Sequence, residues 1–153
     1  MIDGLRRIEL VRHEDARGWF AELVRVSALP KPVRQANMSF SRRGVIRGLH
    51  FHERGQDDVF VCLAGMVRVV VLDRTSGETF TEDIGDDNPV AIYVPGVHAH
   101  GYEALTDCTF MYLVTEEYDR ERPDENEVAW DDERVRHLWS TSSPILSARD
   151  ASS

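Results

Sequence analysis

The stretch 43–52, RGVIRGLHFH, ends in two histidines separated by a single residue. If this apolar run is a β-strand, alternation places His50 and His52 on one face and Leu49 and Phe51 on the other. Two imidazoles on one face can ligate a metal ion. Alternatively, one of them can act as a general base that a carboxylate orients from behind. Other residues of the chain are needed to distinguish a metal site from a general base.

The metal interpretation uses His50, His52, Asp58 and the later His100. This order resembles the general metal-binding pattern of the cupins, in which two histidines, a carboxylate and a later histidine meet inside a β-barrel. Such a set suits Fe, Mn, Ni or Zn. Here the acid is an aspartate that lies farther from His52 than the usual glutamate.

The metal-free interpretation uses His50 as a general base, a buried carboxylate that orients it, and a tyrosine on the far side of the substrate. Epimerisation next to a ketone needs this set, because a base removes the acidified α-proton from one face and an acid returns a proton to the other. Tyr112 and Asp150 are candidates, although spacing alone does not select them.

Short apolar runs separated by turns dominate the chain and predict an all-β protein. We expect strands over residues 5–12, 19–24, 35–41, 43–52, 59–63, 66–72, 79–84, 90–94 and 108–115, a histidine-bearing loop over 95–102, and one helix over 131–139. Many short strands fit an antiparallel double-sheet jelly roll, in which the little helix that we expect lies near the C-terminus. A small-molecule site would lie between its sheets.

Length and charge restrict the class of protein further. The 153 residues suit a single domain over 1–153. A formal net charge of −9 argues against nucleic-acid or anionic-membrane partners, although a local arginine cluster can still hold a small anion. There is no long apolar run and no signal-peptide pattern, so we expect a cytoplasmic protein. Cys62 and Cys108 are expected to be buried free thiols.

The sequence resembles the dTDP-4-dehydrorhamnose 3,5-epimerase family, a branch of the cupins. The most specific match is residues 43–51, RGVIRGLHF. Further matches follow in the family's order over nearly the whole chain: 15–22 (DARGWFAE), 35–39 (QANMS), 95–102 (PGVHAHGY), 110–112 (FMY), 128–132 (VAWDD) and 144–150 (PILSARD).

The resemblance implies a role for individual residues. His50 falls on the family's catalytic base, Asp150 on the carboxylate that pairs with it, and Tyr112 on the catalytic acid. The positions that hold the nucleotide diphosphate and sugar, or that line the pocket, are Arg17, Phe20, Glu22, Gln35, Asn37, Arg47, His100 and Tyr118, where Tyr118 would stack on the nucleotide base. The resemblance also implies a homodimer that acts without a metal or other cofactor on a nucleotide-linked 4-keto-6-deoxyhexose.

The sequence departs from the family at two positions. Asp58 lies at or next to a position where the family usually has a lysine that helps to hold the enolate. His52 stands where glutamine is common. Because a carboxylate opposes an oxyanion, Asp58 should either point away or change the chemistry. Three alternatives to epimerisation at C3, C5 or both therefore remain: 3,4-ketoisomerisation, a metal-dependent cupin reaction, and sugar-nucleotide binding without catalysis.

Overall fold

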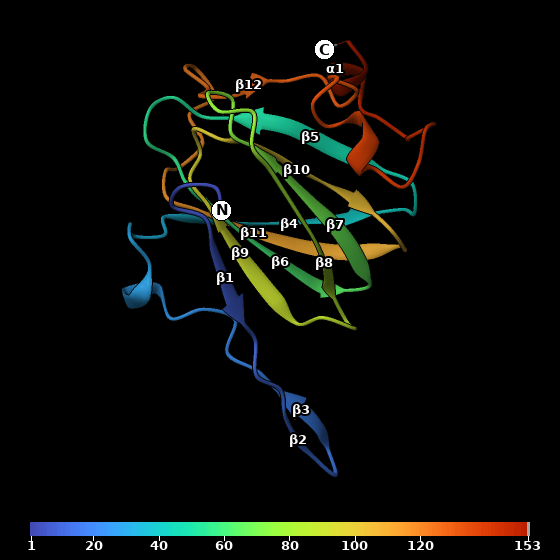
Figure 1. Cartoon of the computed structure of the whole chain (residues 1–153). Coiled ribbons are helices and arrows are strands. Elements are labelled where there is room, and N and C mark those ends of the chain that lie inside the picture. Colours follow the sequence, from blue (N-terminus) through green and yellow to red (C-terminus); the bar gives the residue numbers. More distant parts are fainter. Residues whose placement is uncertain (153) are drawn as a thin grey trace.

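The computed structural model describes residues 1–152 and contains two five-stranded antiparallel sheets that pack face to face (Figure 1). The first sheet has the order β1-β9-β6-β11-β4 and the second the order β12-β5-β10-β7-β8. The strands are β1 (Arg6–Glu9), β4 (Gln35–Ser41), β5 (Ile46–Phe51), β6 (Asp58–Ala64), β7 (Met66–Leu72), β8 (Thr79–Gly85), β9 (Val90–Val94), β10 (Ala99–Ala104), β11 (Cys108–Val114) and β12 (Asn126–Glu127). The expected jelly roll is confirmed.

Side-chain patterning explains why these runs form strands. Along β4, polar Gln35, Asn37 and Ser39 are half-buried and alternate with exposed Met38 and Phe40, as the sequence predicts. By contrast, β9 is apolar and buried at every position, because both of its faces are covered.

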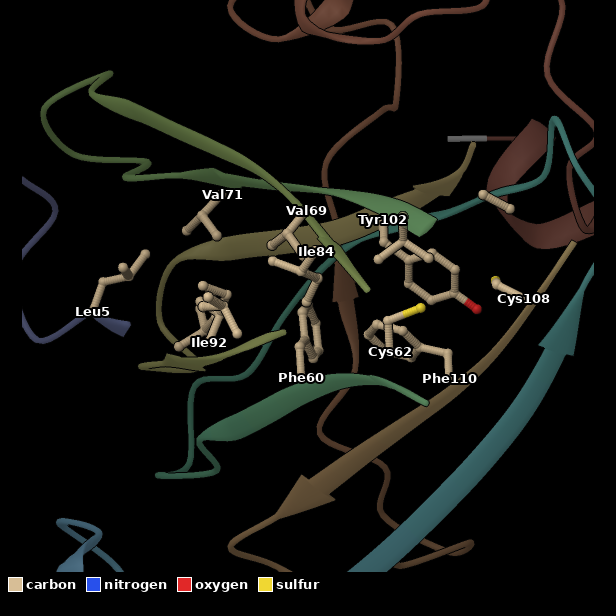
Figure 2. Close-up of a cluster of buried hydrophobic side chains, with 14 of the residues drawn as sticks. Leu5, Phe60, Cys62, Val69, Val71, Ile84, Ile92, Tyr102, Cys108 and Phe110 are labelled. Carbon is tan, nitrogen blue, oxygen red and sulfur yellow. The ribbon is translucent and has the colours of Figure 1, made fainter. Parts of the chain in front are cut away.

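The main hydrophobic core lies between the two sheets (Figure 2). Phe60 and Phe110 from the first sheet meet Val69 and Tyr102 from the second, and the Tyr102 and Phe110 rings stack with centroids 4.0 Å apart. Two smaller clusters contain residues from one sheet and from the segments that cover it. Cys62 and Cys108 are buried free thiols in the main core, as expected.

Three expected elements differ from the structure. The first strand is confined to Arg6–Glu9, and the second to β3 (Gly18–Phe20), which forms a hairpin with β2 (His13–Asp15). His100 lies on strand β10 rather than in a loop. Tertiary pairing explains two of these differences: β1 pairs with the five-residue β9, and β10 is fixed between β5 and β7.

The predicted helix over 131–139 is wrong. Only the 3₁₀ turn η2 (Arg136–Leu138) forms there. The Asp132 carboxylate instead accepts the backbone N–H of Arg134 at 3.0 Å and its guanidinium at 2.9 Å, which closes a local turn. The α-helix of the described residues is α1 (Ala148–Ala151), where the Ser147 hydroxyl caps the N–H of Asp150; a second 3₁₀ turn is η1 (Val26–Ala28).

Gly48 on β5 lies close to the backbone of β10. Its φ is +137°, and a Cβ there would lie 2.9 Å from Gly101 Cα and 3.0 Å from the carbonyl oxygen of His100. Only glycine fits this backbone without displacing a strand that carries site residues.

Gly48→Ala is therefore expected to lower the free energy of unfolding by about 2–4 kcal/mol, combining the positive-φ cost with overpacking. Gly77→Ala is the matched control, since Gly77 also has positive φ (+79°) but open space around its Cβ position. Denaturant unfolding of both variants measures the difference, and an equal loss in the two would contradict the close-approach argument.

Candidate active site

A pocket of about 110 Å³ opens between the two sheets. His50 and His100 enter it from β5 and β10 of one sheet, and Asp58 and Tyr112 from β6 and β11 of the other. Its lining consists of Arg47, His50, His52, Gln56, Asp58, Phe60, His100, Gly101, Tyr102, Phe110, Tyr112 and Glu125. An apolar wall with a few convergent polar groups is typical of a small-molecule site.

A histidine–aspartate pair lies at one side of the pocket. The Nε2 of His50 donates to Oδ1 of Asp150 over 3.0 Å, and the Gly48 N–H donates to the other carboxylate oxygen over 3.3 Å. Helix α1 packs on β5 and so brings residue 150 back to residue 50. With Nε2 protonated, Nδ1 of His50 is the nitrogen that can accept a proton.

Asp150 is 4 % exposed, although it lies three residues from the end of the chain. Burial alone would raise its pKa, but the hydrogen bond and charge of His50 and the Gly48 N–H outweigh burial and lower the pKa overall. The carboxylate therefore stays ionised and can fix the tautomer of His50.

Tyr112 reaches the pocket from β11, on the sheet opposite His50. Burial raises the pKa of its hydroxyl, and the negative charges of Asp58 and Glu125 add to the effect. The phenol is thus protonated at neutral pH and can donate.

An outer pocket of about 330 Å³ adjoins the first and shares Gln56, Tyr112 and Glu125 with it. Its wall includes the predicted residues Gln35, Asn37 and Tyr118. The Gln35 amide donates to Asn37 Oδ1 at 2.8 Å and accepts the Tyr118 N–H at 2.9 Å. The Tyr118 ring is 56 % exposed and so has an open face.

Arg47 lies on β5 in the lining of the inner pocket. Its guanidinium donates to Ser41 Oγ at 2.8 Å and to the Phe40 carbonyl at 3.2 Å. The side chain is exposed, and these bonds leave further guanidinium N–H groups for an anion.

His52, Asp58 and His100 form a second group in the same pocket, with donor atoms within 4.8 Å of one another. Asp58 thus points into the pocket rather than away. His50 lies outside this group and pairs with Asp150 instead, so the four residues of the metal interpretation are divided between two clusters.

Three predicted substrate-binding residues do not reach the pocket of their own chain. Arg17 and Phe20 belong to the β2–β3 hairpin, which extends away from the sheets (Figure 1), and Glu22 follows it. Arg17 pairs with Asp15, and Glu22 pairs with Arg25. Phe20 is 65 % exposed.

Sequence reasoning did not find Gln56 and Glu125, which line both pockets. Gln56 lies in a polar loop without a motif. Only its position two residues before Asp58, on a loop that leads into a pocket strand, could have suggested it. Glu125 precedes a two-residue strand that the sequence pattern does not show.

Comparison with known proteins identifies the family of this chain. The profile described as dTDP-4-dehydrorhamnose 3,5-epimerase matches residues 1–153. The chain belongs to this family. The match confirms the reading of the chain as an isomerase that epimerises a nucleotide-linked deoxysugar in deoxysugar biosynthesis.

Individual relatives agree with the family match. The spore coat polysaccharide biosynthesis protein SpsL of Bacillus subtilis is 41% identical over 149 residues, covering 92% of this chain and 98% of SpsL. NovW, a 4-keto-6-deoxy sugar epimerase of Streptomyces spheroides, superposes with a TM-score of 0.88 at 32% identity over 98% of this chain and 81% of NovW. ChmJ is a 3'-monoepimerase of Streptomyces bikiniensis, and its structure is in complex with dTDP-quinovose. It superposes with a TM-score of 0.87 at 29% identity, over 98% of this chain and 82% of ChmJ.

Proposed function

We propose that this chain inverts C3, C5 or both carbons of a dTDP-linked 4-keto-6-deoxyhexose, with His50 as base and Tyr112 as acid. The observation that carries the proposal is the pairing of His50 on β5 with buried Asp150 on α1, with Tyr112 entering the same pocket from the opposite sheet. Base and acid on opposite walls are what inversion at a carbon requires. The dTDP-quinovose bound to ChmJ supports the nucleotide.

The mechanism follows from the protonation states. Ionised Asp150 holds the Nε2–H tautomer of His50, so Nδ1 removes the proton α to the C4 ketone. The electron pair moves to the ketone oxygen and gives an enolate. Protonated Tyr112 then delivers a proton to the opposite face of the carbon and recovers one from solvent.

The remaining pocket residues suit the nucleotide diphosphate. Arg47 would bind a phosphate through its guanidinium, because planar N–H groups match phosphate oxygens. Gln35 and Asn37 would bind the nucleoside in the outer pocket, and the exposed Tyr118 ring would stack on the base. His100 would line the sugar end.

A homodimer gives Arg17, Phe20 and Glu22 a role. The projecting hairpin carries Trp19 at 54 % and Phe20 at 65 % exposure, and such rings are favourable when a second copy covers them. In our proposal the hairpin brings these residues to the site of a second copy. A cytoplasmic location is part of the proposal, because the free thiols Cys62 and Cys108 fit a reducing compartment. Among residues 1–152, no helix is long and apolar enough to cross a membrane.

Product analysis tests the proposed reaction. The protein is incubated with dTDP-4-keto-6-deoxyglucose, the products are reduced with borodeuteride, and the sugars are identified by gas chromatography with mass spectrometry. Sugars inverted at C3 or C5 that carry the deuterium of reduction at C4 support epimerisation. Deuterium of reduction at C3 would establish ketoisomerisation instead, and unchanged sugar with tight dTDP binding would establish a binding protein.

Asp150→Asn is expected to slow α-proton exchange by about 10²- to 10⁴-fold, because the amide no longer fixes the His50 tautomer. The affinity for dTDP should stay unchanged, since Asp150 lies behind His50. Exchange is followed by NMR in deuterated water and affinity by calorimetry. Asp131→Asn, at an exposed aspartate, is the control. Equal rates in the two variants would remove Asp150 from the mechanism.

A further inference from the structure

A chain of hydroxyl groups joins the two sheets next to the guanidinium of Arg47. Tyr102 extends from β10 of the second sheet, and its hydroxyl lies 2.9 Å from Ser41 Oγ and 3.1 Å from Ser39 Oγ on β4 of the first sheet. Ser41 Oγ in turn accepts the Nε–H of Arg47, which lies on β5, at 2.8 Å. The chain therefore connects a guanidinium of the inner pocket to hydroxyls from both sheets.

Burial determines how the protons of this chain are arranged. A guanidinium only donates, so Ser41 Oγ is the acceptor for Arg47. Ser41 is 2 % exposed, so its own proton needs an acceptor inside the protein, and Tyr102 Oη at 2.9 Å provides one. Tyr102, at 3 % exposure, then donates to Ser39. Ser41 and Tyr102 thus each accept one hydrogen bond and donate one, an arrangement that strengthens both bonds.

These contacts occupy one edge of the Arg47 guanidinium. Nε–H donates to Ser41, and Nη2–H donates to the Phe40 carbonyl at 3.2 Å, so both acceptors lie on β4. A guanidinium has five N–H groups in one plane, and the two bonds leave three of them, on Nη1 and Nη2. Parallel N–H groups on one edge match two oxygens of a phosphate. The bonds to β4 therefore leave the outer edge of Arg47 for an anion.

The contacts also fix the direction in which Arg47 points. Its side chain is exposed on β5, and an exposed arginine that lacks such partners has to be ordered when a ligand binds, at a cost in free energy. The acceptor Ser41 is itself held by Tyr102, whose ring stacks on Phe110 with centroids 4.0 Å apart. The main core thus holds the guanidinium in one orientation before a ligand arrives.

We propose that Ser41 and Tyr102 are positioning residues that hold the Arg47 guanidinium in the orientation that binds the diphosphate of the substrate. The inference rests on the proposed epimerase function, in which Arg47 binds a phosphate. Both hydroxyls act through Arg47 and not on the reacting carbon. The diphosphate is bound equally in the ground state and in the transition state, so loss of either hydroxyl should raise KM and leave kcat unchanged.

The first test is the affinity for dTDP, measured by calorimetry. Ser41→Ala and Tyr102→Phe should each weaken binding about 2- to 12-fold, which corresponds to the cost of ordering one long side chain. Tyr102→Phe keeps the ring that stacks on Phe110. Tyr93→Phe is the matched control, because its buried hydroxyl donates to Asp57 outside the pocket. Wild-type affinity in both Ser41→Ala and Tyr102→Phe would overturn the proposal, and wild-type affinity in Tyr102→Phe alone would overturn the role of Tyr102.

A double-mutant cycle separates positioning of Arg47 from a general effect on the fold. Arg47→Ala removes the group that Ser41 holds, so Ser41→Ala should cause no further loss of dTDP affinity in this background. Independent effects on the fold would add instead. Additive losses of affinity would show that Ser41 does not act through Arg47, and would overturn the proposal.

The second readout is the kinetics of deuterium exchange into dTDP-4-keto-6-deoxyglucose. In Ser41→Ala and in Tyr102→Phe, KM should rise by the same factor as the dissociation constant of dTDP, while kcat stays at the wild-type value. A fall in kcat at unchanged KM would assign the hydroxyls to the chemical step and overturn the proposal. Absence of exchange in the wild type would instead contradict the proposed reaction, while the dTDP affinities of the variants would still report on the positioning of Arg47.

Discussion

Replacement of His50 by alanine is expected to abolish the incorporation of solvent deuterium into dTDP-4-keto-6-deoxyglucose. The ionised Asp150 carboxylate holds Nε2 of His50, so Nδ1 is the basic nitrogen, whereas Nδ1 of His52 and Nδ1 of His100 each lie against a backbone carbonyl. Removal of a positioned base costs about 10²–10⁴ in rate. Proton NMR of the C3 and C5 signals measures the loss.

Two controls separate loss of chemistry from loss of structure. His137→Ala removes an exposed histidine on η2 and should exchange deuterium at the wild-type rate. Binding of dTDP to His50→Ala should persist, since the proposed nucleotide contacts lie elsewhere. Exchange in His50→Ala at the wild-type rate would exclude His50 as the base.

Tyr112→Phe is expected to reduce inversion by about 10²–10⁴-fold while sparing part of the exchange. The variant lacks the acid on the far face, but His50 still removes the α-proton and can return deuterium to the face from which it came. Burial raises the pKa of Tyr112, so the wild-type hydroxyl is protonated and able to donate.

The experiment compares two rates on the same sample: deuterium uptake by NMR and formation of inverted sugar by product analysis. Tyr93→Phe serves as the control, because the Tyr93 hydroxyl donates to Asp57 outside the pocket. If Tyr112→Phe inverts as fast as the wild type, Tyr112 is not the acid.

Local pattern was sufficient to predict much of the fold. The alternation in β4 and the apolar runs of β7 and β9 give strands with the predicted bounds, because the side-chain pattern of each segment matches the burial of its positions in the sheet. Alternation also placed His50 and His52 in the pocket lining and Leu49 in the core behind it.

Contacts between distant segments could not be read from local pattern. The pairing of His50 with His100, the return of Asp150 to His50 and the hydrogen bond between Ser41 and Tyr102 depend on sheet order and on how α1 packs on β5. The resemblance selected Asp150, whereas a polar residue in a C-terminal tail gives no such signal by itself. The predicted helix over 131–139 failed because the Asp132 side chain satisfies the backbone locally.

Exchange of the substrate's C3 and C5 protons in the presence of the wild-type protein is the most direct test of the proposed enolisation. Proton NMR in deuterated water with dTDP-4-keto-6-deoxyglucose should show loss of the C3 signal, the C5 signal or both, and the signal that disappears identifies the carbon that reacts. Retention of both signals, in a sample where dTDP binding is demonstrated, would contradict enolisation by the His50–Asp150 pair.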